Sequence, residues 1–208
     1  PLKQYRPTRD LLHVSGLLLT GDTLDVFVCH LPSRSGGAKE SEPYRLYAAH
    51  ILRMEVDSIM NIRSLPQVII MGDFNDYPTN QSIQKILEAE APPVMPNDLA
   101  STTGSTNPSL KLYHLLARKA KSKDFGSYKY RGEWGLLDHL IVSGTLLNQS
   151  NHFFTSEEKA NVCLLPFLLK DDEKYGDKEP FRTYKGMKYQ GGVSDHLPIY
   201  ADFELILY

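Results

Sequence analysis

The spacing of apolar and polar residues divides the first third of the chain into two strands and a helix. Residues 11–32 contain two apolar runs separated by a glycine-containing turn at residues 20–22, which predicts two strands joined in a tight hairpin. Residues 42–63 repeat apolar positions at helical spacing, with Ser41 placed to cap the helix and Pro43 in its first turn. We expect the buried face of this helix to consist of Tyr44, Tyr47, Ala48, Ile51, Leu52 and Ile59.

The rest of the chain mixes strand-like and helix-like segments. Strands are predicted at residues 67–71, 135–144 and 196–205. Helices are predicted at residues 79–90, with Thr79 or Asn80 as the cap, and at residues 109–123, which end in lysines. Polar loops are expected at residues 33–43 and 170–192. This order is neither a strict strand–helix alternation nor all strands, so it indicates a layered α/β or α+β domain with the sheet inside and the helices outside.

Composition narrows the class of protein. The 208 residues are 41% hydrophobic and 23% charged, which suits a single globular domain with a substantial core. A net charge of −2 argues against a protein that coats nucleic acid non-specifically, but it allows a phosphate-processing enzyme whose positive charge comes from a metal ion. Cys29 and Cys163 lack zinc-site spacing and cannot build a disulfide framework, and Cys29 is expected to be a buried free thiol.

No segment approaches the ~20 apolar residues that are needed to span a bilayer. The apolar run at residues 161–169 is therefore expected to be a core strand, with a hairpin that touches a membrane as the alternative. We expect a soluble protein, and the sequence leaves its compartment and its oligomeric state open.

Polar side chains that can carry chemistry stand at the ends of the predicted strands. The stretch VIIMGDFND, at residues 68–76, runs from four apolar residues directly into glycine and polar side chains. An ordinary strand followed by a turn is one explanation, because glycine and Asx residues commonly follow strands. Binding sites also favour strand ends, where a rigid frame positions the loops. The candidates of this kind are His30, Asp73, Asn75, Asp138, Asp195 and His196.

Gathered at one edge of a sheet, these six residues supply two imidazoles, three carboxylates and one amide. Hard oxygen ligands suit Mg²⁺ or Mn²⁺, and histidines suit acid–base chemistry near neutral pH. Structural roles stay open as well: a hydrogen-bonded histidine at position 30, a loop cap at Asp138 and a plain turn at Asp195. His139 follows Asp138 on a strand and points to the opposite face, so it is expected to be structural.

Two arginines and the three consecutive residues 194–196 are further candidates for the site. Arg34, in a glycine-rich loop, and Arg182 can each contact a phosphate or simply lie on the surface. Ser194, Asp195 and His196 are adjacent on an extended chain, so they point to opposite faces and cannot form a catalytic triad by themselves. The sequence also lacks a nucleophile elbow, a P-loop and a dinucleotide-binding glycine motif.

Four motifs, in order, carry a resemblance: HLPSRSGG, MGDFND, WGLLDHLIVS and GGVSDHLPIYADF. This ordered set resembles the endonuclease/exonuclease/phosphatase superfamily, which includes deoxyribonuclease-like enzymes, abasic-site endonucleases, inositol-polyphosphate phosphatases and bacterial sphingomyelinases. The loop sequences PSRSGG and RTYKGMKYQGGVSDHLP resemble those of a bacterial branch of this superfamily. The resemblance covers nearly the whole chain and implies one domain over residues 1–208, a two-sheet β-sandwich flanked by helices on both outer faces, and metal-dependent hydrolysis of a phosphoester.

The resemblance also implies a role for each strand-end residue. His30 matches a histidine that contacts the scissile phosphate and can act as an acid, and Asp73 matches the aspartate that orients or deprotonates the attacking water. Asn75 matches an amide that holds the phosphate or that water. Asp138 matches the aspartate that buttresses a catalytic histidine, and His196 matches that histidine.

The remaining positions and the ligands follow in the same way. Asp195 matches a metal-associated carboxylate, and Arg34 and Arg182 are candidates for substrate binding. The implied cofactor is Mg²⁺ or Mn²⁺. The implied partner is a phosphoester substrate, either nucleic acid or a phosphorylated small molecule.

One departure from the family pattern matters. Family members begin with a strand that carries an asparagine and then a strand that carries a metal-binding glutamate, and no counterpart of either lies upstream of His30. The chain is then either the C-terminal two thirds of a longer domain or a binding or scaffolding domain that has lost its metal ligand. We expect the first, because the other site residues are intact. We also expect the isolated chain to bind Mg²⁺ weakly, to turn over slowly and to expose sheet edges.

Overall fold

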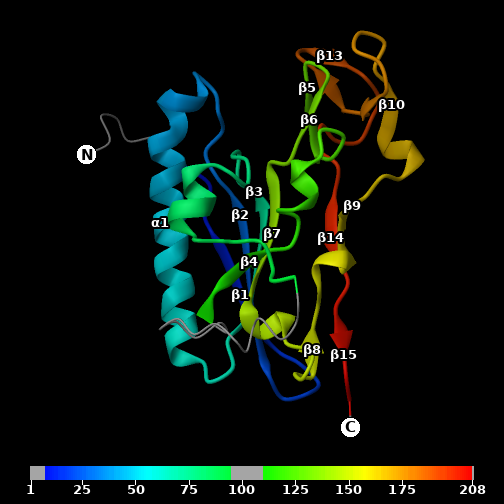
Figure 1. Cartoon of the computed structure of the whole chain (residues 1–208). Coiled ribbons are helices and arrows are strands. Elements are labelled where there is room, and N and C mark those ends of the chain that lie inside the picture. Colours follow the sequence, from blue (N-terminus) through cyan, green and yellow to red (C-terminus); the bar gives the residue numbers. More distant parts are fainter. Residues whose placement is uncertain (1–7, 95–109, 208) are drawn as a thin grey trace.

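A five-stranded sheet lies at the centre of the computed structural model, which describes residues 8–94 and 110–207 (Figure 1). The order of its strands is β1 (Leu12–Leu17), β2 (Thr23–His30), β3 (Gln67–Asp73), β7 (Asp138–Ser143) and β4 (Leu112–His114). The β2–β3 pair is parallel, and the other pairs are antiparallel. The predicted hairpin at residues 11–32 is confirmed as β1 and β2, and the strands predicted at residues 67–71 and 135–144 are confirmed as β3 and β7.

Within residues 8–94 and 110–207, the remaining elements are one long helix, short helical turns and five pairs of short strands. The helix is α1 (Ala38–Ile62), and η1 (Ser82–Ile86) is a π-helical turn. The strand pairs are β9 (Ala160–Val162) with β14 (Ile199–Ala201), β8 (Phe153–Phe154) with β15 (Glu204–Leu205), β5 (Tyr128–Tyr130) with β6 (Glu133–Gly135), β10 (Leu169–Asp171) with β11 (Lys178–Pro180), and β12 (Tyr184–Lys185) with β13 (Lys188–Tyr189). The 3₁₀ turns are η3 (Lys119–Lys121), η4 (Gly144–Leu147), η5 (Glu157–Lys159) and η6 (Pro166–Leu168).

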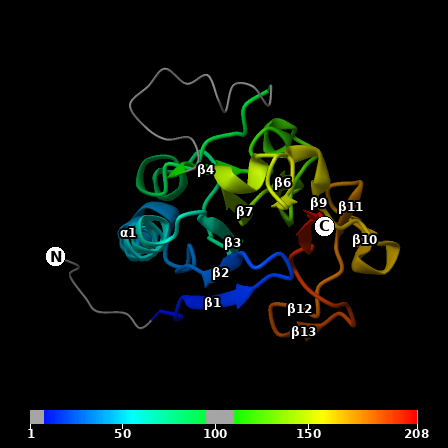
Figure 2. The ribbon, with the colours of Figure 1, turned by 90° about the horizontal axis from the view of Figure 1, so that it is seen from below.

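The central sheet separates two apolar cores. Successive side chains of a strand face opposite sides, so Val68 and Ile70 of β3 pack with α1, whereas Ile69 and Met71 pack on the other face with β9 and β14. Figure 2 shows α1 on one side of the sheet and the strands β9 and β14 on the other. The expected layered α/β class is confirmed. Among the described residues, α1 is the single α-helix, and no described helix is long and apolar enough to cross a membrane.

The helix α1 differs from the prediction in its start and in its buried face. It begins at Ala38 after Gly37, so Ser41 is not the cap; its hydroxyl donates a hydrogen bond to the Gly37 carbonyl from within the first turn (2.6 Å). The predicted face is wrong for Tyr44, Tyr47 and Ile51, which line an open groove between α1 and β1. The buried positions are Ser41, Arg45, Ala48, Ala49, Leu52, Val56 and Met60. A buried arginine inside this stripe hid the true face from a pattern based on apolar residues.

The two later helices were not foreseen correctly. Residues 112–114 form β4, because their backbone completes the free edge of β7 and their side chains are buried; this tertiary pairing overrides local helix propensity. The predicted helix at residues 109–123 is therefore wrong, and its residue 109 lies outside the described residues. The helix predicted at residues 79–90 shortens to η1, where the Asn80 side chain accepts from Tyr77 and Arg34 and does not cap a helix.

The predictions for the apolar segments around Cys29 and at residues 161–169 have opposite outcomes. Cys29 is a buried free cysteine, and burial raises the pKa of its thiol to about 12, so this expectation is confirmed. The core strand predicted at residues 161–169 is wrong beyond β9, since Leu164, Leu165 and Phe167 are exposed. The strand predicted at residues 196–205 divides into β14 and β15.

Gly72 is required where β3 approaches β2. Its φ is +128°, and a Cβ at this position would lie 1.9 Å from the carbonyl oxygen of Cys29. Gly16, in β1, is a matched control because nothing lies within 4 Å of its added Cβ. We predict that Gly72→Ala lowers the free energy of unfolding by about 3 kcal/mol or more, and that Gly16→Ala changes it by less than about 1 kcal/mol. Urea unfolding followed by circular dichroism measures both, and equal losses would contradict the prediction.

Candidate active site

Strand register places His30, Asp73 and Asp138 in one row across the sheet. His30 of β2 is paired with Asp73 of β3, and Asp73 is paired with Asp138 of β7. Alternation puts Asp73 on the same face as Ile69 and Met71, which is the face covered by β9 and β14. The three side chains therefore meet at the end of β3, on one side of the sheet.

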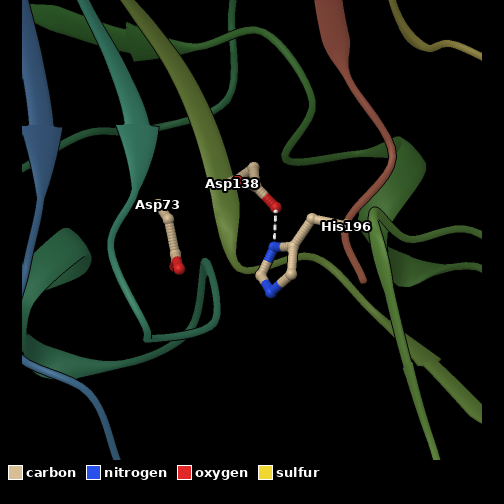
Figure 3. Close-up of side chains that lie close together, drawn as sticks. All are labelled: Asp73, Asp138 and His196. Atoms are coloured by element: carbon tan, nitrogen blue, oxygen red, sulfur yellow. Dashed lines mark hydrogen bonds and ion pairs between the residues drawn. The ribbon is translucent and has the colours of Figure 1, made fainter. Parts of the chain in front are cut away.

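His196 reaches this row from the opposite layer. It precedes β14, and its Nδ1–H donates a hydrogen bond to Oδ2 of Asp138 (2.7 Å; Figure 3). Ser127 donates to the same carboxylate oxygen, and its own carbonyl accepts from the Leu197 amide (2.7 Å). Asp73, Asp138 and His196 each offer one ligand atom, and these atoms lie within 4.8 Å of one another. Two carboxylates and an imidazole thus form a group that can hold a metal ion.

Asn75 is held in a fixed orientation by its neighbours. Its φ is +52°, and its main-chain N–H donates to Oδ1 of Asp73 (2.7 Å). Its side-chain Nδ2 donates to the Leu31 carbonyl (3.0 Å) and to Oδ2 of Asp73 (3.2 Å). If the side-chain amide were turned by 180°, its oxygen would face the Leu31 carbonyl and the Asp73 carboxylate, which are both acceptors. The orientation of the amide is therefore determined. Among the described residues nothing donates to the amide oxygen Oδ1, which therefore stays available as an acceptor.

The two titratable groups at the centre are tuned in complementary ways. Burial raises the pKa of Asp73, the Asn75 amide and the two histidines oppose this shift, and the charge of Asp138 adds to it. Burial alone would lower the pKa of His196, but its hydrogen bond to Asp138 and the charges of Asp138, Asp73 and Asp195 outweigh burial, so the pKa is raised. A more basic carboxylate thus stands beside a histidine that favours its protonated form.

Asp76 anchors the loop that carries Asn75. It is 1% exposed, and its Oδ1 forms ion pairs with Nε of Arg45 (2.8 Å) and with Nη2 of Arg34 (3.2 Å). Its Oδ2 accepts from the Ser82 hydroxyl (2.7 Å). No pattern in the sequence predicts a role for Asp76 or Arg45. The only signal for Arg45 is its helical spacing from the buried Ala49 and Leu52.

A second anchor is a pair of buried histidines. The Leu116 amide donates to Nδ1 of His114 (3.1 Å), so Nε2 of His114 carries the hydrogen and donates to Nδ1 of His139. Nε2 of His139 then donates to the Asp76 carbonyl (2.8 Å). Burial lowers the pKa of His139 to about 4 and that of His114 well below its usual value, so both are neutral. His139 points away from Asp138, as expected, and Phe74 is buried in the core on the α1 side.

The other predicted residues lie around this centre. Asp195 is exposed and outside the group of potential metal ligands, although its charge contributes to the pKa of His196. Arg34 donates to the Asn75 carbonyl (2.7 Å) and the Asn80 side chain (2.9 Å) as well as to Asp76, so most of its donors serve the protein itself. Arg182 flanks Tyr128, a residue that the sequence analysis missed and whose ring centroid lies 4.9 Å from that of His196.

The chain is similar to known proteins in sequence and in structure. A sequence model described as the Endonuclease/Exonuclease/phosphatase family matches residues 2–205. No curated protein matches the chain. Similar solved structures include a mannosyl-6-phosphatase of Bacteroides thetaiotaomicron, with 17% identity over 88% of this chain and 52% of that chain and a TM-score of 0.48. The catalytic domain of human nocturnin has 19% identity over 90% of this chain and 49% of that chain, with a TM-score of 0.46. The chain therefore spans about half the length of these structures.

Asp73 should cost stability in the metal-free protein. Its pKa is raised in the folded state, so the stability that its protonated form provides is present below the unfolded pKa and is lost as pH rises through the folded pKa. We predict that Asp73→Asn, which stays uncharged and keeps an acceptor for the Asn75 amide, raises Tm in EDTA at neutral pH. The gain should disappear in acid. Asp124→Asn, at an exposed position, is the control, and a lower Tm for Asp73→Asn at neutral pH would contradict the prediction.

The ion pair between Arg45 and Asp76 should be essential for stability. Removing one partner of a buried pair leaves a buried charge poorly compensated, which costs about 3–5 kcal/mol. We predict a loss of this size for Arg45→Met. Lys39→Met, at an exposed position of the same helix, is the control and should change the free energy of unfolding by about 0.5 kcal/mol or less. Urea unfolding gives both values, and a similar loss for the two variants would refute the assignment.

Proposed function

We propose that this chain, which belongs to the endonuclease/exonuclease/phosphatase family, is a hydrolase of phosphoester bonds that depends on a divalent metal ion. The observation that carries the proposal is the direct cross-strand pairing of Asp73 with Asp138, next to the hydrogen bond between Asp138 and His196. Two carboxylates placed opposite each other repel. A bound cation would compensate this repulsion, and the histidine completes the acid–base pair.

The donor set fits Mg²⁺ or Mn²⁺. Mg²⁺ is commonly held through one or two carboxylates while it keeps several waters, and Mn²⁺ also accepts imidazole nitrogen. Asp73 and Asp138 would hold the ion, and Asp195 stays a further candidate at the rim. When bound, the cation would offset the negative charge of the phosphate and stabilise the transition state.

Asp73 and Asn75 are suited to handle the attacking water. The Asp73 carboxylate is fixed beside Asn75 by two hydrogen bonds, and there it would orient that water and accept its proton. Both amide hydrogens of Asn75 already serve Leu31 and Asp73, so the free Oδ1 can only accept a hydrogen bond. A phosphate oxygen has no hydrogen to offer, whereas the water has a second one. We therefore assign Asn75 to the water and not to the phosphate.

The two histidines are suited to the phosphate oxygens. Nδ1 of His196 is committed to Asp138, which leaves Nε2 to face the substrate. With its raised pKa, protonated His196 donates from Nε2 to an oxygen that gains charge in the transition state. His30 lies at the more open end of the row, with its Nε2 3.4 Å from Oδ2 of Asp73 and its side chain 44% exposed. That position suits a donor to the phosphate or to the leaving oxygen.

A binding or scaffolding domain is the second candidate. It is favoured by the absence of a glutamate from the group of potential metal ligands in the described residues. In that case the fold would persist without turnover, and the site would hold a phosphorylated ligand without cleaving it.

Hydrolysis of bis-p-nitrophenyl phosphate, with Mg²⁺, with Mn²⁺ and with EDTA, separates the two candidates. We predict slow turnover by this chain that EDTA abolishes and that His196→Ala lowers by about 10²–10⁴-fold in kcat. His50→Ala, at an exposed position of α1, should leave activity unchanged. The same assay with p-nitrophenyl phosphate distinguishes a phosphodiesterase from a phosphatase. Absence of EDTA-sensitive activity, together with absence of metal binding by calorimetry, would favour the binding domain.

A further inference from the structure

The segment 181–193 is a cationic arm in a slightly acidic chain. It contains Arg182, Lys185 and Lys188 and no acidic residue, whereas the whole chain has a net charge of −2. The segment just before it, residues 171–179, holds Asp171, Asp172, Glu173, Asp177 and Glu179. The arm therefore carries a net positive charge in a chain that is slightly acidic overall, which suits contact with an anionic ligand.

The hairpin of β12 and β13 presents its side chains in two unusual pairs. Lys185 lies directly opposite Lys188, and Tyr184 lies directly opposite Tyr189. Opposed like charges destabilise a strand pair, and none of the ion pairs among the described residues includes either lysine. The two tyrosines are 57% and 65% exposed, with ring centroids 5.4 Å apart in an edge-on arrangement. The tyrosine pair stabilises the hairpin as a cross-strand aromatic pair and still leaves both rings largely exposed, whereas the stability of the hairpin does not explain the lysine pair.

The arm is fixed to the candidate active site at its base. The Val193 amide donates to the Phe181 carbonyl (2.7 Å), which closes the arm three residues before His196. Arg182 stands beside Tyr128, whose ring lies against His196. The buried Nε of Arg182 has no hydrogen-bond partner among the described residues. Figure 1 shows β13 at the end of the molecule where β2 ends and α1 begins. A substrate held by the row of site residues can therefore extend onto the arm.

We propose that the hairpin of β12 and β13 binds single-stranded nucleic acid that extends from the candidate active site. The two lysines contact backbone phosphates, and the exposed tyrosine rings stack on unpaired bases, which is the combination found in sequence-tolerant single-strand binding. The placement of this strand relative to the chemistry rests on the proposed function; the binding itself does not.

The same features disfavour two other anionic ligands. Duplex DNA keeps its bases stacked on one another, so exposed tyrosines would gain nothing from it beyond the phosphate contacts. An anionic membrane needs a larger apolar surface than the hairpin offers, since its exposed apolar side chain is Met187 at the turn, with the two tyrosines beside it. These ligands are the alternatives that the experiment must separate.

Fluorescence anisotropy of a labelled oligothymidylate, with the Asp73→Asn protein in EDTA, measures binding without hydrolysis. In this background we expect Lys185→Gln with Lys188→Gln to weaken binding about tenfold or more and to reduce the slope of log affinity against log salt by about 1.4, which is two contacts at ~0.7 each. Tyr184→Ser with Tyr189→Ser should weaken binding by about tenfold or more as well. The matched control is Lys121→Gln with Lys123→Gln, at exposed positions outside the arm, and it should bind as the background does.

The outcomes are distinct. Equal affinity of the lysine variant and its control would overturn the proposal, as would equal affinity for the oligothymidylate and for a duplex of the same length. Binding to vesicles of phosphatidylserine and phosphatidylcholine that depends on the two lysines, with no binding to the oligothymidylate, would assign the arm to a membrane instead. Hydrolysis of bis-p-nitrophenyl phosphate by the lysine variant should stay unchanged, which verifies its folding. Because binding and hydrolysis are measured separately, either proposal can fail alone.

Discussion

The register of β3 between β2 and β7 is the constraint on which the site depends. It sets Asp73 beside His30 on one side and Asp138 on the other, all on the face opposite α1. A slip by one residue would turn each of these side chains into the opposite core. The register is secured because β3 is buried on both faces, and because Gly72 permits a close approach to Cys29 that no other residue allows. Packing and chemistry are thus determined by the same hydrogen bonds.

The two faces of the loop after β3 have different energetic roles. Towards the site, Asp73 is held in a state that burial and a neighbouring carboxylate disfavour. Away from the site, Asp76 is paired with Arg45 and Arg34, and its carbonyl accepts from a neutral histidine. Stable contacts behind the loop therefore support unfavourable contacts in front of it. This division is common at functional sites, where strain is maintained by the surrounding structure.

Local pattern was sufficient to identify four of the five central strands, which are β1, β2, β3 and β7. Alternation correctly placed His139 away from Asp138, and the strand ends supplied side chains that do converge: His30, Asp73, Asn75, Asp138 and His196. The roles assigned to them stay predictions. The failures concern partners distant in sequence. Arg45 is buried because Asp76 lies above it, and β4 replaces a helix because β7 offers a free edge. Neither partner can be read from the segment itself.

Two pairs of like charges lie directly opposite each other in this chain. Asp73 with Asp138 and Lys185 with Lys188 are both directly opposite in register, and each costs stability in the protein alone. The acidic pair is enclosed at the end of the sheet, where a small cation can satisfy both carboxylates. The basic pair is on an exposed hairpin, where an extended anion can satisfy both lysines. A phosphodiester chain would suit both pairs. Its scissile phosphate would lie against the cation held by the two carboxylates, and its next phosphates would contact the two lysines. The charge arrangement is therefore better matched to a substrate with several phosphates in series than to an isolated one.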